Sequence, residues 1–274
     1  MPPKNLVSNA MKKTQLRKPL RIAVFDIDGT IFRSSLLIEL FNELVRRGIY
    51  PESARYEVDR NYVAWLNRKG HYNDYMVKVV NIFYDNLGGC SVHKIEPAVR
   101  AVIRRQKDRV HRYPRQLIRD LRKKGYFIMA ISNSPEPMVQ RFATMMKFDA
   151  AIGHVLEVVD GVYTGRSILN GTKHPGKAWM DKIKILERFG KDNMFTIDLK
   201  NSVMIGDSEG DLPLLSIVGH PIAFNPSLPL ALVARKKGWR IIVERKDVAY
   251  DIRDAELIRL RGQSPRVPYG NRRK

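Results

Sequence analysis

Short apolar runs alternate with amphipathic stretches along most of the chain. The runs that we interpret as buried strands are Ile22–Phe25, Phe127–Ile131, Val203–Ile205 and Ile222–Phe224. Between and after them, apolar residues recur with helical spacing at about 136–147, 177–190, 210–217 and 227–237. Strands that alternate with helices indicate a parallel sheet with helices on both faces.

One long segment interrupts this alternation. Residues 34–111 contain only helical patterns, so we interpret them as a helical cap inserted after the first strand. Alternating apolar positions at 153–166 surround Asp160-Gly161, which is a strong signal for a hairpin turn. The expected fold class is therefore α/β: a Rossmann-like parallel sheet with helices on both faces and a helical cap after the first strand.

The charge of the chain is large and uneven. Its 274 residues include 49 Lys and Arg but 28 Asp and Glu, a formal net charge of +21. The surplus lies in three blocks, at 1–21, 100–124 and 259–274. The first and last lack apolar periodicity, which indicates disorder. We expect basic tails at 1–20 and 259–274, a core domain formed by 21–33 and 112–258, and a cap domain at 34–111.

Several classes of protein are excluded by composition. No apolar run approaches the roughly 20 residues of a membrane span, so we expect neither a spanning segment nor a membrane partner. Cys90 is the single cysteine, so neither an intrachain disulfide nor a Cys-based zinc site can form. The first residues lack the apolar core of a secretory signal, and we expect a cytoplasmic protein.

Acidic residues follow two of the predicted strands. Asp26 and Asp28 stand directly after the first strand, where residues two apart share a face and can converge on one point. Asp207 follows a later strand, at the edge of the sheet where ligands bind in such folds. Neighbouring carboxylates repel one another and need a cation or a proton between them. Oxygen ligands of this kind suit Mg²⁺.

Four motifs stand in a fixed order along the chain. Asp26-Ile27-Asp28-Gly29-Thr30 comes first, Ser132 follows the second strand, a lysine precedes a helix, and Gly206-Asp207-Ser208 leads to Asp211. With these motifs the chain resembles the haloacid dehalogenase superfamily, and most closely its phosphoserine-phosphatase-like branch, subfamily IB. The resemblance covers about residues 21–250, although 34–111 matches only in position and helical character.

The resemblance implies a Mg²⁺-dependent phosphatase that forms an aspartyl-phosphate. Asp26 would be the nucleophile, and Asp28 the general acid and then the general base. Mg²⁺ would be held by the Asp26 carboxylate, the Asp28 backbone carbonyl and Asp207. The remaining implied roles are phosphate binding by Ser132, Asn133 and a lysine, orientation of that lysine by Asp211, and support of the site by Thr30.

Three lysines could fill the third motif, namely Lys177, Lys182 and Lys184. Lys182 stands four residues before Leu186 and 25 residues before Asp207, which is the spacing that the branch usually shows. We therefore predict that Lys182 binds the phosphoryl group.

The expected substrate is a small phosphorylated metabolite. The basic residues at 100–113 favour a poly-anionic one, because Arg binds phosphate and carboxylate in a bidentate manner. A solvated surface helix explains them equally well. Phosphoserine phosphatases of the branch hold the substrate amine with a Glu nine residues after the nucleophile, and Ser35 occupies that position here.

Two other functions stay open. One is a phosphotransferase or mutase of the same superfamily, which uses an acceptor other than water. The other is a nucleic-acid-associated protein that uses the basic tails. A pure nucleic-acid binder would not need four acidic residues at one edge of a sheet, so we favour the phosphatase.

Overall fold

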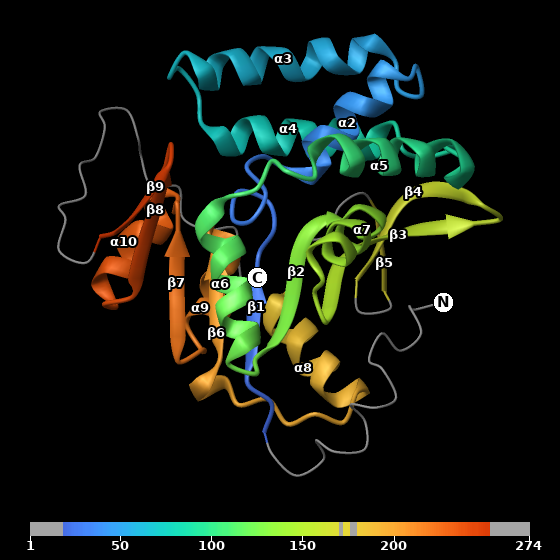
Figure 1. Ribbon diagram of the computed structural model, residues 1–274. Helices are drawn as coiled ribbons and strands as arrows, with labels where there is room; N and C mark the ends of the chain where they lie inside the picture. Colours follow the sequence, from blue (N-terminus) through green and yellow to red (C-terminus); the bar gives the residue numbers. More distant parts are fainter. Residues whose placement is uncertain (1–18, 170–171, 176–179, 253–274) are drawn as a thin grey trace, which may run out of the picture. The chain divides into compact units, whose positions relative to one another are not determined.

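The computed structural model describes residues 19–169, 172–175 and 180–252 (Figure 1). Almost all of the two predicted basic tails, together with Lys177, therefore lies outside the described residues. The chain divides into two compact units. The first comprises Met1–Ile31, His111–Met129 and Lys182–Lys274, and the second Phe32–Val110 and Ala130–Asp181. The predicted domain boundaries stay a prediction.

The first unit is built on a mostly parallel sheet. Its strands, in spatial order, are the start of β2 (Phe127–Pro135), β1 (Ile22–Phe25), β6 (Val203–Gly206), β7 (His220–Phe224), β8 (Arg240–Arg245) and β9 (Val248–Asp251). β1, β6, β7 and β8 pair in parallel, and β9 runs antiparallel to β8. Every residue of β1 and β6 is buried, as expected for strands that are covered on both faces.

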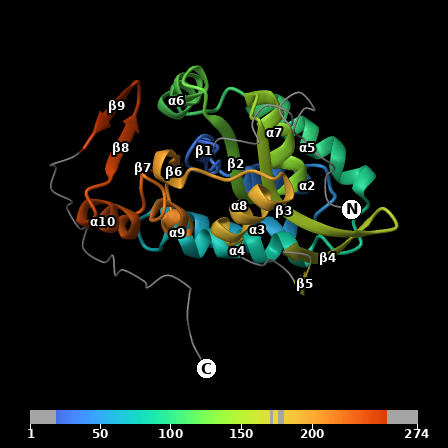
Figure 2. The ribbon, with the colours of Figure 1, turned by 90° about the horizontal axis from the view of Figure 1, so that it is seen from below.

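Helices lie on both faces of this sheet. They are α6 (Arg112–Lys123), α8 (Lys182–Asp192), α9 (Leu212–Leu215) and α10 (Leu228–Lys236), with short 3-10 turns η1 (Leu199–Asn201) and η2 (Glu209–Asp211). Figure 2 shows α6 on one side of the strands of the first unit and α8, α9 and α10 on the other. The expected α/β fold is therefore confirmed.

The second unit contains the helical insertion. Its helices are α2 (Leu36–Arg46), α3 (Glu52–Leu66), α4 (Tyr72–Asp85), α5 (Val92–Gln106) and α7 (Glu136–Met146), and its strands are the rest of β2, β3 (Ala150–Val159), β4 (Val162–Leu169) and β5 (Thr172–Pro175). Four helices and no strand element occur between β1 and α6, so the helical segment after the first strand is confirmed. No described helix has the length and apolarity needed to cross a bilayer.

The predicted hairpin is present as β3 and β4, which pair antiparallel. Asp160 and Gly161 have φ angles of 49° and 77°, and positive φ at both central positions matches the twist of the flanking strands. The loop after α4 attaches to this hairpin: the Gly89 N–H donates to the Tyr163 carbonyl, and the Tyr163 N–H donates to the Cys90 carbonyl. Backbone hydrogen bonds therefore join the hairpin to the α4–α5 loop.

Glu43 on α2 forms ion pairs with three arginines of the helical segment. Its side chain is fully buried and accepts hydrogen bonds from Arg46 (2.5 Å), Arg47 (2.6 Å) and Arg105 (2.8 Å). The bond from Arg46 lowers the pKa of Glu43 most, burial opposes it, and the other two guanidinium groups bring the pKa to about 2. Arg105 therefore fastens α5 to α2.

Arg105 was one of the cations expected to favour a poly-anionic substrate. Arg109, another of them, donates to Glu39 on α2 at 2.9 Å. Both residues are thus engaged by carboxylates of their own unit, which removes part of the basis for a poly-anionic substrate.

We expect Glu43→Gln to lower the free energy of unfolding by about 2 kcal/mol at pH 7, because it weakens the charge-assisted hydrogen bonds from three arginines. The pKa of Glu43 is lower in the folded protein than in the unfolded chain. The stabilisation is therefore complete above about pH 4.5 and is lost as the pH falls toward about 2. Urea denaturation from pH 7 to pH 3 measures both effects.

The matched control is Glu57→Gln, which removes the exposed pair of Glu57 with Lys78. It should change stability by less than about 1 kcal/mol. An equal effect of the two substitutions, or a Glu43→Gln effect that does not depend on pH, would contradict this account.

Candidate active site

Two acidic residues lie side by side because two buried strands end together. β1 ends at Phe25, which pairs with Ile205 of β6. Asp26 follows β1, and its N–H donates to the Ile205 carbonyl at 3.0 Å. Asp207 follows the end of β6. Parallel strands bring their carboxyl ends to the same edge of a sheet, where ligands bind in folds of this class.

Lys182, the first residue of α8, is buried between two carboxylates. Its side chain is only 2% exposed, and Nζ donates to Asp26 Oδ1 at 2.7 Å and to Asp211 Oδ1 at 2.6 Å. Lys184, two residues later, is exposed. Of the three lysines considered, Lys182 is thus the one that the structure places beside Asp26, while Lys177 lies outside the described residues.

Asp211 is held in place by the turn that precedes α9. Its Oδ1 accepts the bond from Lys182, and its Oδ2 accepts from the N–H groups of Asp207 (3.1 Å) and Ser208 (3.2 Å) and from Ser208 Oγ (3.3 Å). The sequence indicated Asp211 as the residue that orients the lysine, but no role was predicted for Ser208 beside it. The spacing Ser208-x-x-Asp211, which is that of a capping box, is the signal for this contact.

The loop after β1 packs directly on Asp207. Gly29 has a φ of +79°, and a Cβ atom there would lie 2.2 Å from Asp207 Oδ2. Thr30 Oγ1 donates to Asp207 Oδ1 at 3.3 Å. Gly206 has a similar function, because a Cβ atom at that position would lie 2.4 Å from Asp211 Cγ. Only glycine lets the backbone approach these carboxylates so closely.

Burial and the repulsion between neighbouring carboxylates raise the pKa values of Asp26 and Asp207. Burial raises the pKa of Asp26 to about 7, although Lys182 lowers it, and Asp211 and Asp28 raise it further. Burial and the charges of Asp26 and Asp211 raise the pKa of Asp207 well above its usual value. Burial alone would lower the pKa of Lys182, but the two carboxylates raise it above its ordinary value. One ammonium therefore faces three carboxylates.

The residual negative charge makes this edge a candidate for a divalent cation. One oxygen each of Asp26, Asp207 and Asp211 lies within 4.8 Å of the others. Both oxygens of Asp211 already accept hydrogen bonds, so Asp26 and Asp207 are the better ligands. Hard carboxylate oxygens fit Mg²⁺, which keeps several waters and needs few protein ligands. Asp28, expected to contribute its carbonyl, lies half-buried in the same loop.

The two remaining predicted residues belong to the second unit. Ser132 is buried in β2, and its Oγ accepts from the Ser134 N–H at 3.0 Å. Asn133 Oδ1 accepts from the Met180 N–H at 3.3 Å. Both residues lie within β2, which continues to Pro135, and not after the strand as expected. Their contact with a phosphoryl group stays a prediction.

A family model described as haloacid dehalogenase-like hydrolase matches residues 23–216. Phosphoserine phosphatase SerB1 of Mycobacterium tuberculosis is 35% identical over 120 residues, which make up 43% of this chain and 36% of that protein. The match therefore spans only about a third of the length of the first curated relatives.

Two solved structures share the fold. A protein of unknown function from Bordetella pertussis Tohama I superposes with a TM-score of 0.64 at 21% identity, over 82% of this chain and 98% of that chain. A phosphoserine phosphatase, solved as a phospho-aspartyl intermediate analogue, superposes with a TM-score of 0.54 at 22% identity, over 84% and 96%. These structures show the fold, and the family model over residues 23–216 confirms the expected family resemblance.

We expect Gly29→Ala to weaken Mg²⁺ binding by about tenfold or more, because the new methyl group displaces the Asp207 carboxylate. The matched control is Gly238→Ala. Gly238 has a φ of +66° and nothing within 4 Å of its Cβ position, so the control introduces backbone strain without a clash. Titration calorimetry with MgCl₂ compares the two variants. Equal affinities would show that the Gly29 loop does not position Asp207.

Proposed function

Because the chain belongs to the haloacid dehalogenase-like hydrolase family, we propose that it is a Mg²⁺-dependent phosphatase that hydrolyses a phosphate monoester through an aspartyl-phosphate. The observation that carries this proposal is that Asp26, directly after β1, accepts a hydrogen bond from the Lys182 ammonium and lies close to Asp207. Several relatives with similar sequences are named phosphoserine phosphatases, which supports the same chemistry.

In the first step, an Asp26 carboxylate oxygen attacks phosphorus and forms a new P–O bond. The bond between phosphorus and the ester oxygen breaks, and Asp28 donates its proton to the leaving alcohol. Asp26 and Asp28 follow β1 in one loop, so a single segment supplies both the nucleophile and the acid. Such a division of roles is favourable when the acid is close enough to reach the leaving oxygen.

In the second step, a water molecule attacks the phosphorus atom of the aspartyl-phosphate. Asp28, now a carboxylate, accepts a proton from that water. The bond between phosphorus and the Asp26 oxygen breaks, which releases inorganic phosphate and restores the Asp26 carboxylate. Asp28 returns to its protonated form, so the cycle is balanced.

Attack by a carboxylate on a phosphate dianion requires positive charge around the reacting group. A bound Mg²⁺ would offset the charge of the nucleophile and of the phosphoryl oxygens. Lys182 would supply a fixed positive charge beside Asp26, and Asp211 would keep its ammonium in position. Ser132 and Asn133 would donate hydrogen bonds to the phosphoryl oxygens, as the family resemblance implies.

The proposed substrate is a small phosphorylated metabolite. We propose a cytoplasmic location, because a chain whose single cysteine is Cys90 forms no intrachain disulfide and suits a reducing compartment. Ser35 stands where phosphoserine phosphatases of the branch carry a Glu. It is buried and precedes the first residue of α2. Because a serine has a hydroxyl and no carboxylate, this position cannot form an ion pair with a substrate amine. We therefore propose a substrate other than phosphoserine.

The ratio of the two products distinguishes hydrolysis from phosphotransfer. Hydrolysis releases phosphate and alcohol in equal amounts, whereas transfer to another acceptor releases less phosphate than alcohol.

We expect Asp26→Asn to abolish phosphate release from every monoester in a screen of phosphorylated metabolites, because the amide cannot attack phosphorus. Removal of divalent cations with EDTA should also abolish activity, and added Mg²⁺ should restore it. Asp192→Asn, an exposed carboxylate on α8 paired with Arg188, is the control and should retain full activity. Undiminished turnover in EDTA or in Asp26→Asn would refute the mechanism.

We expect Lys182→Met to lower kcat by about 100- to 1000-fold, the usual effect of removing one electrostatic contact to the reacting group. Lys184→Met removes an exposed lysine of the same helix and should have little effect. The rate is expressed per folded molecule, with the folded fraction taken from circular dichroism. Comparable rates for the two variants would place the phosphate-binding cation elsewhere.

A further inference from the structure

The helical hairpin of α3 and α4 has an unusually apolar surface at one end. Figure 1 shows the two helices side by side in the second unit, joined by a short turn. We call residues 60–73, which include this turn, the hairpin tip. Of the 15 residues of α3, only Ala54 and Val58 are fully buried. Most side chains of α3 therefore do not contribute to a core.

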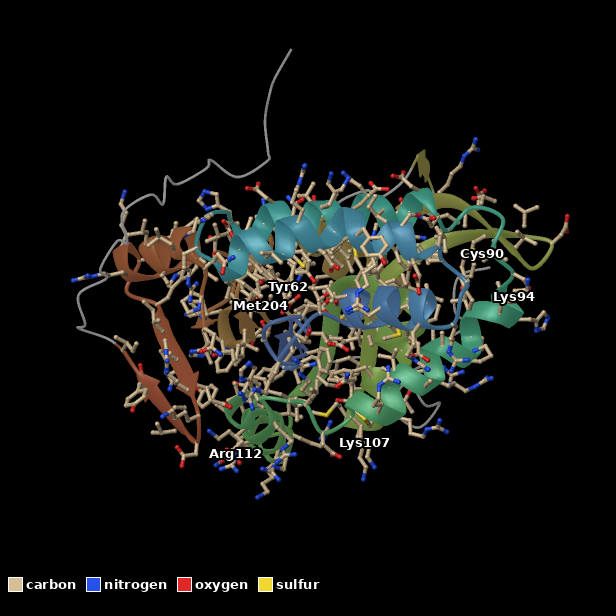
Figure 3. The ribbon with its side chains drawn as sticks, turned by 90° about the horizontal axis from the view of Figure 1, so that it is seen from above. Tyr62, Cys90, Lys94, Lys107, Arg112 and Met204 are labelled. Carbon is tan, nitrogen blue, oxygen red and sulfur yellow. The ribbon has the colours of Figure 1, made fainter. Side chains whose placement is uncertain are left out.

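The apolar residues of the hairpin tip are exposed and contiguous. Tyr62, Val63, Leu66 and Tyr72 are 38%, 50%, 51% and 44% exposed. The ring of Trp65 joins them, since its centroid lies 5.8 Å from that of Tyr62 and 5.1 Å from that of Tyr72. Leu66 lies one helical turn after Tyr62, on the same side of α3. Figure 3 labels Tyr62 on this hairpin.

The charges of the hairpin tip have one sign. Residues 60–73 contain Arg60, Arg68 and Lys69 but no Asp or Glu. All three cations are exposed, and none forms an ion pair with another described residue. Outside this range, Arg55 pairs with Asp59 and Lys78 pairs with Glu57. Unpaired cations are therefore concentrated at the apolar end of the hairpin.

The turn is fixed by backbone hydrogen bonds. The Arg68 N–H donates to the Trp65 carbonyl at 3.0 Å, and the N–H groups of Lys69 and Gly70 donate to the Ala64 carbonyl at 2.8 and 3.1 Å. Arg68 has a φ of 60°, the left-handed conformation that commonly ends a helix. Both cations thus project from an ordered backbone, and little backbone entropy remains to be lost on binding.

Two other kinds of partner fit this surface less well. Nucleic acid bases would need free aromatic faces, but the rings of Trp65 and Tyr75 stack on each other with an interplanar angle of 6°, and Val63 and Leu66 offer no stacking surface. A second copy of the chain would bring two sets of like charges together, because each hairpin tip carries only cations.

We propose that the hairpin tip binds the surface of a bilayer that contains anionic phospholipids. Aliphatic side chains enter the boundary of the acyl region, tyrosines suit the headgroup level, and Lys and Arg are attracted to anionic headgroups. The hairpin tip carries all three kinds of residue, on the end of α3, the turn and the start of α4. This departs from the expectation of no membrane partner, which was based on spanning segments and not on exposed surface.

The first test separates the contribution of the apolar side chains to vesicle binding from the contribution of the charged ones. Full-length protein is sedimented with phosphatidylcholine vesicles that contain 30% phosphatidylglycerol, in about 0.1 M and 0.5 M NaCl. We expect Val63→Ser/Leu66→Ser to lower the partition constant about tenfold or more, with the difference remaining at the higher salt concentration. The matched control is Ile217→Ser/Val248→Ser, two aliphatic residues of similar exposure in the first unit.

The second test concerns the cations. Arg68→Gln/Lys69→Gln should weaken binding about fivefold for each charge removed, because each Lys or Arg near an anionic surface contributes about 1 kcal/mol. Lys191→Gln/Lys236→Gln removes the same charge from exposed positions of the first unit and should cause a much smaller loss. Pure phosphatidylcholine vesicles should bind the wild type weakly.

Thermal unfolding of each variant shows whether the hairpin tip residues are needed for folding. The proposal is overturned if the well-folded Val63→Ser/Leu66→Ser variant binds vesicles like the wild type, or if both control pairs lose as much binding. It is also overturned if light scattering shows a dimer that Val63→Ser/Leu66→Ser dissociates, since a second copy would then cover this surface. None of these measurements depends on phosphatase activity.

Discussion

Three aspartates, Asp26, Asp207 and Asp211, lie close together at one edge of the sheet. They cannot all carry charge unless positive charge is near them, and much of the first unit is arranged around this constraint. α8 begins at Lys182, whose ammonium contacts both Asp26 and Asp211. The turn before α9 directs backbone N–H groups at the second oxygen of Asp211. These contacts leave Asp26 and Asp207 facing each other with too little compensation. The same shortage of positive charge favours the divalent cation that we propose for this site, and that cation would then offset the charge of a phosphate ester.

The elements that carry this cluster could be predicted from the sequence, because each has a strong local signal. β1 and β6 are short apolar runs buried on both faces, and each is followed directly by an aspartate. Lys182 was chosen among three lysines because its spacing matches the one usual in the resembled branch, and the structure places it beside Asp26. The hairpin turn at Asp160-Gly161 needs positive φ at two positions, which few residue pairs tolerate.

Other features were not predicted because their local signal is weak or absent. The apolar run of β8 is only three residues long, between charged ends, and was not interpreted as a strand. Every residue of β9 is exposed, so β9 forms no apolar run at all. β2 continues through polar residues to Pro135 where a loop was expected. The helix expected at 210–217 is a 3-10 turn followed by the short α9. The spacing of Tyr62 and Leu66 is helical, but periodicity alone does not show whether that side of α3 is covered.

The interleaving of the two units determines the order in which the protein can form during synthesis. The second unit ends at Asp181, so its residues have all been made while β6, β7, β8 and β9 are still to come. Domains generally fold as units as the chain emerges from the ribosome. Asp26 is synthesised early, yet Lys182, Asp207 and Asp211 all come more than 150 residues later in the chain. During synthesis, the Asp26 carboxylate therefore remains solvated until Lys182, Asp207 and Asp211 have been made. The site is assembled last.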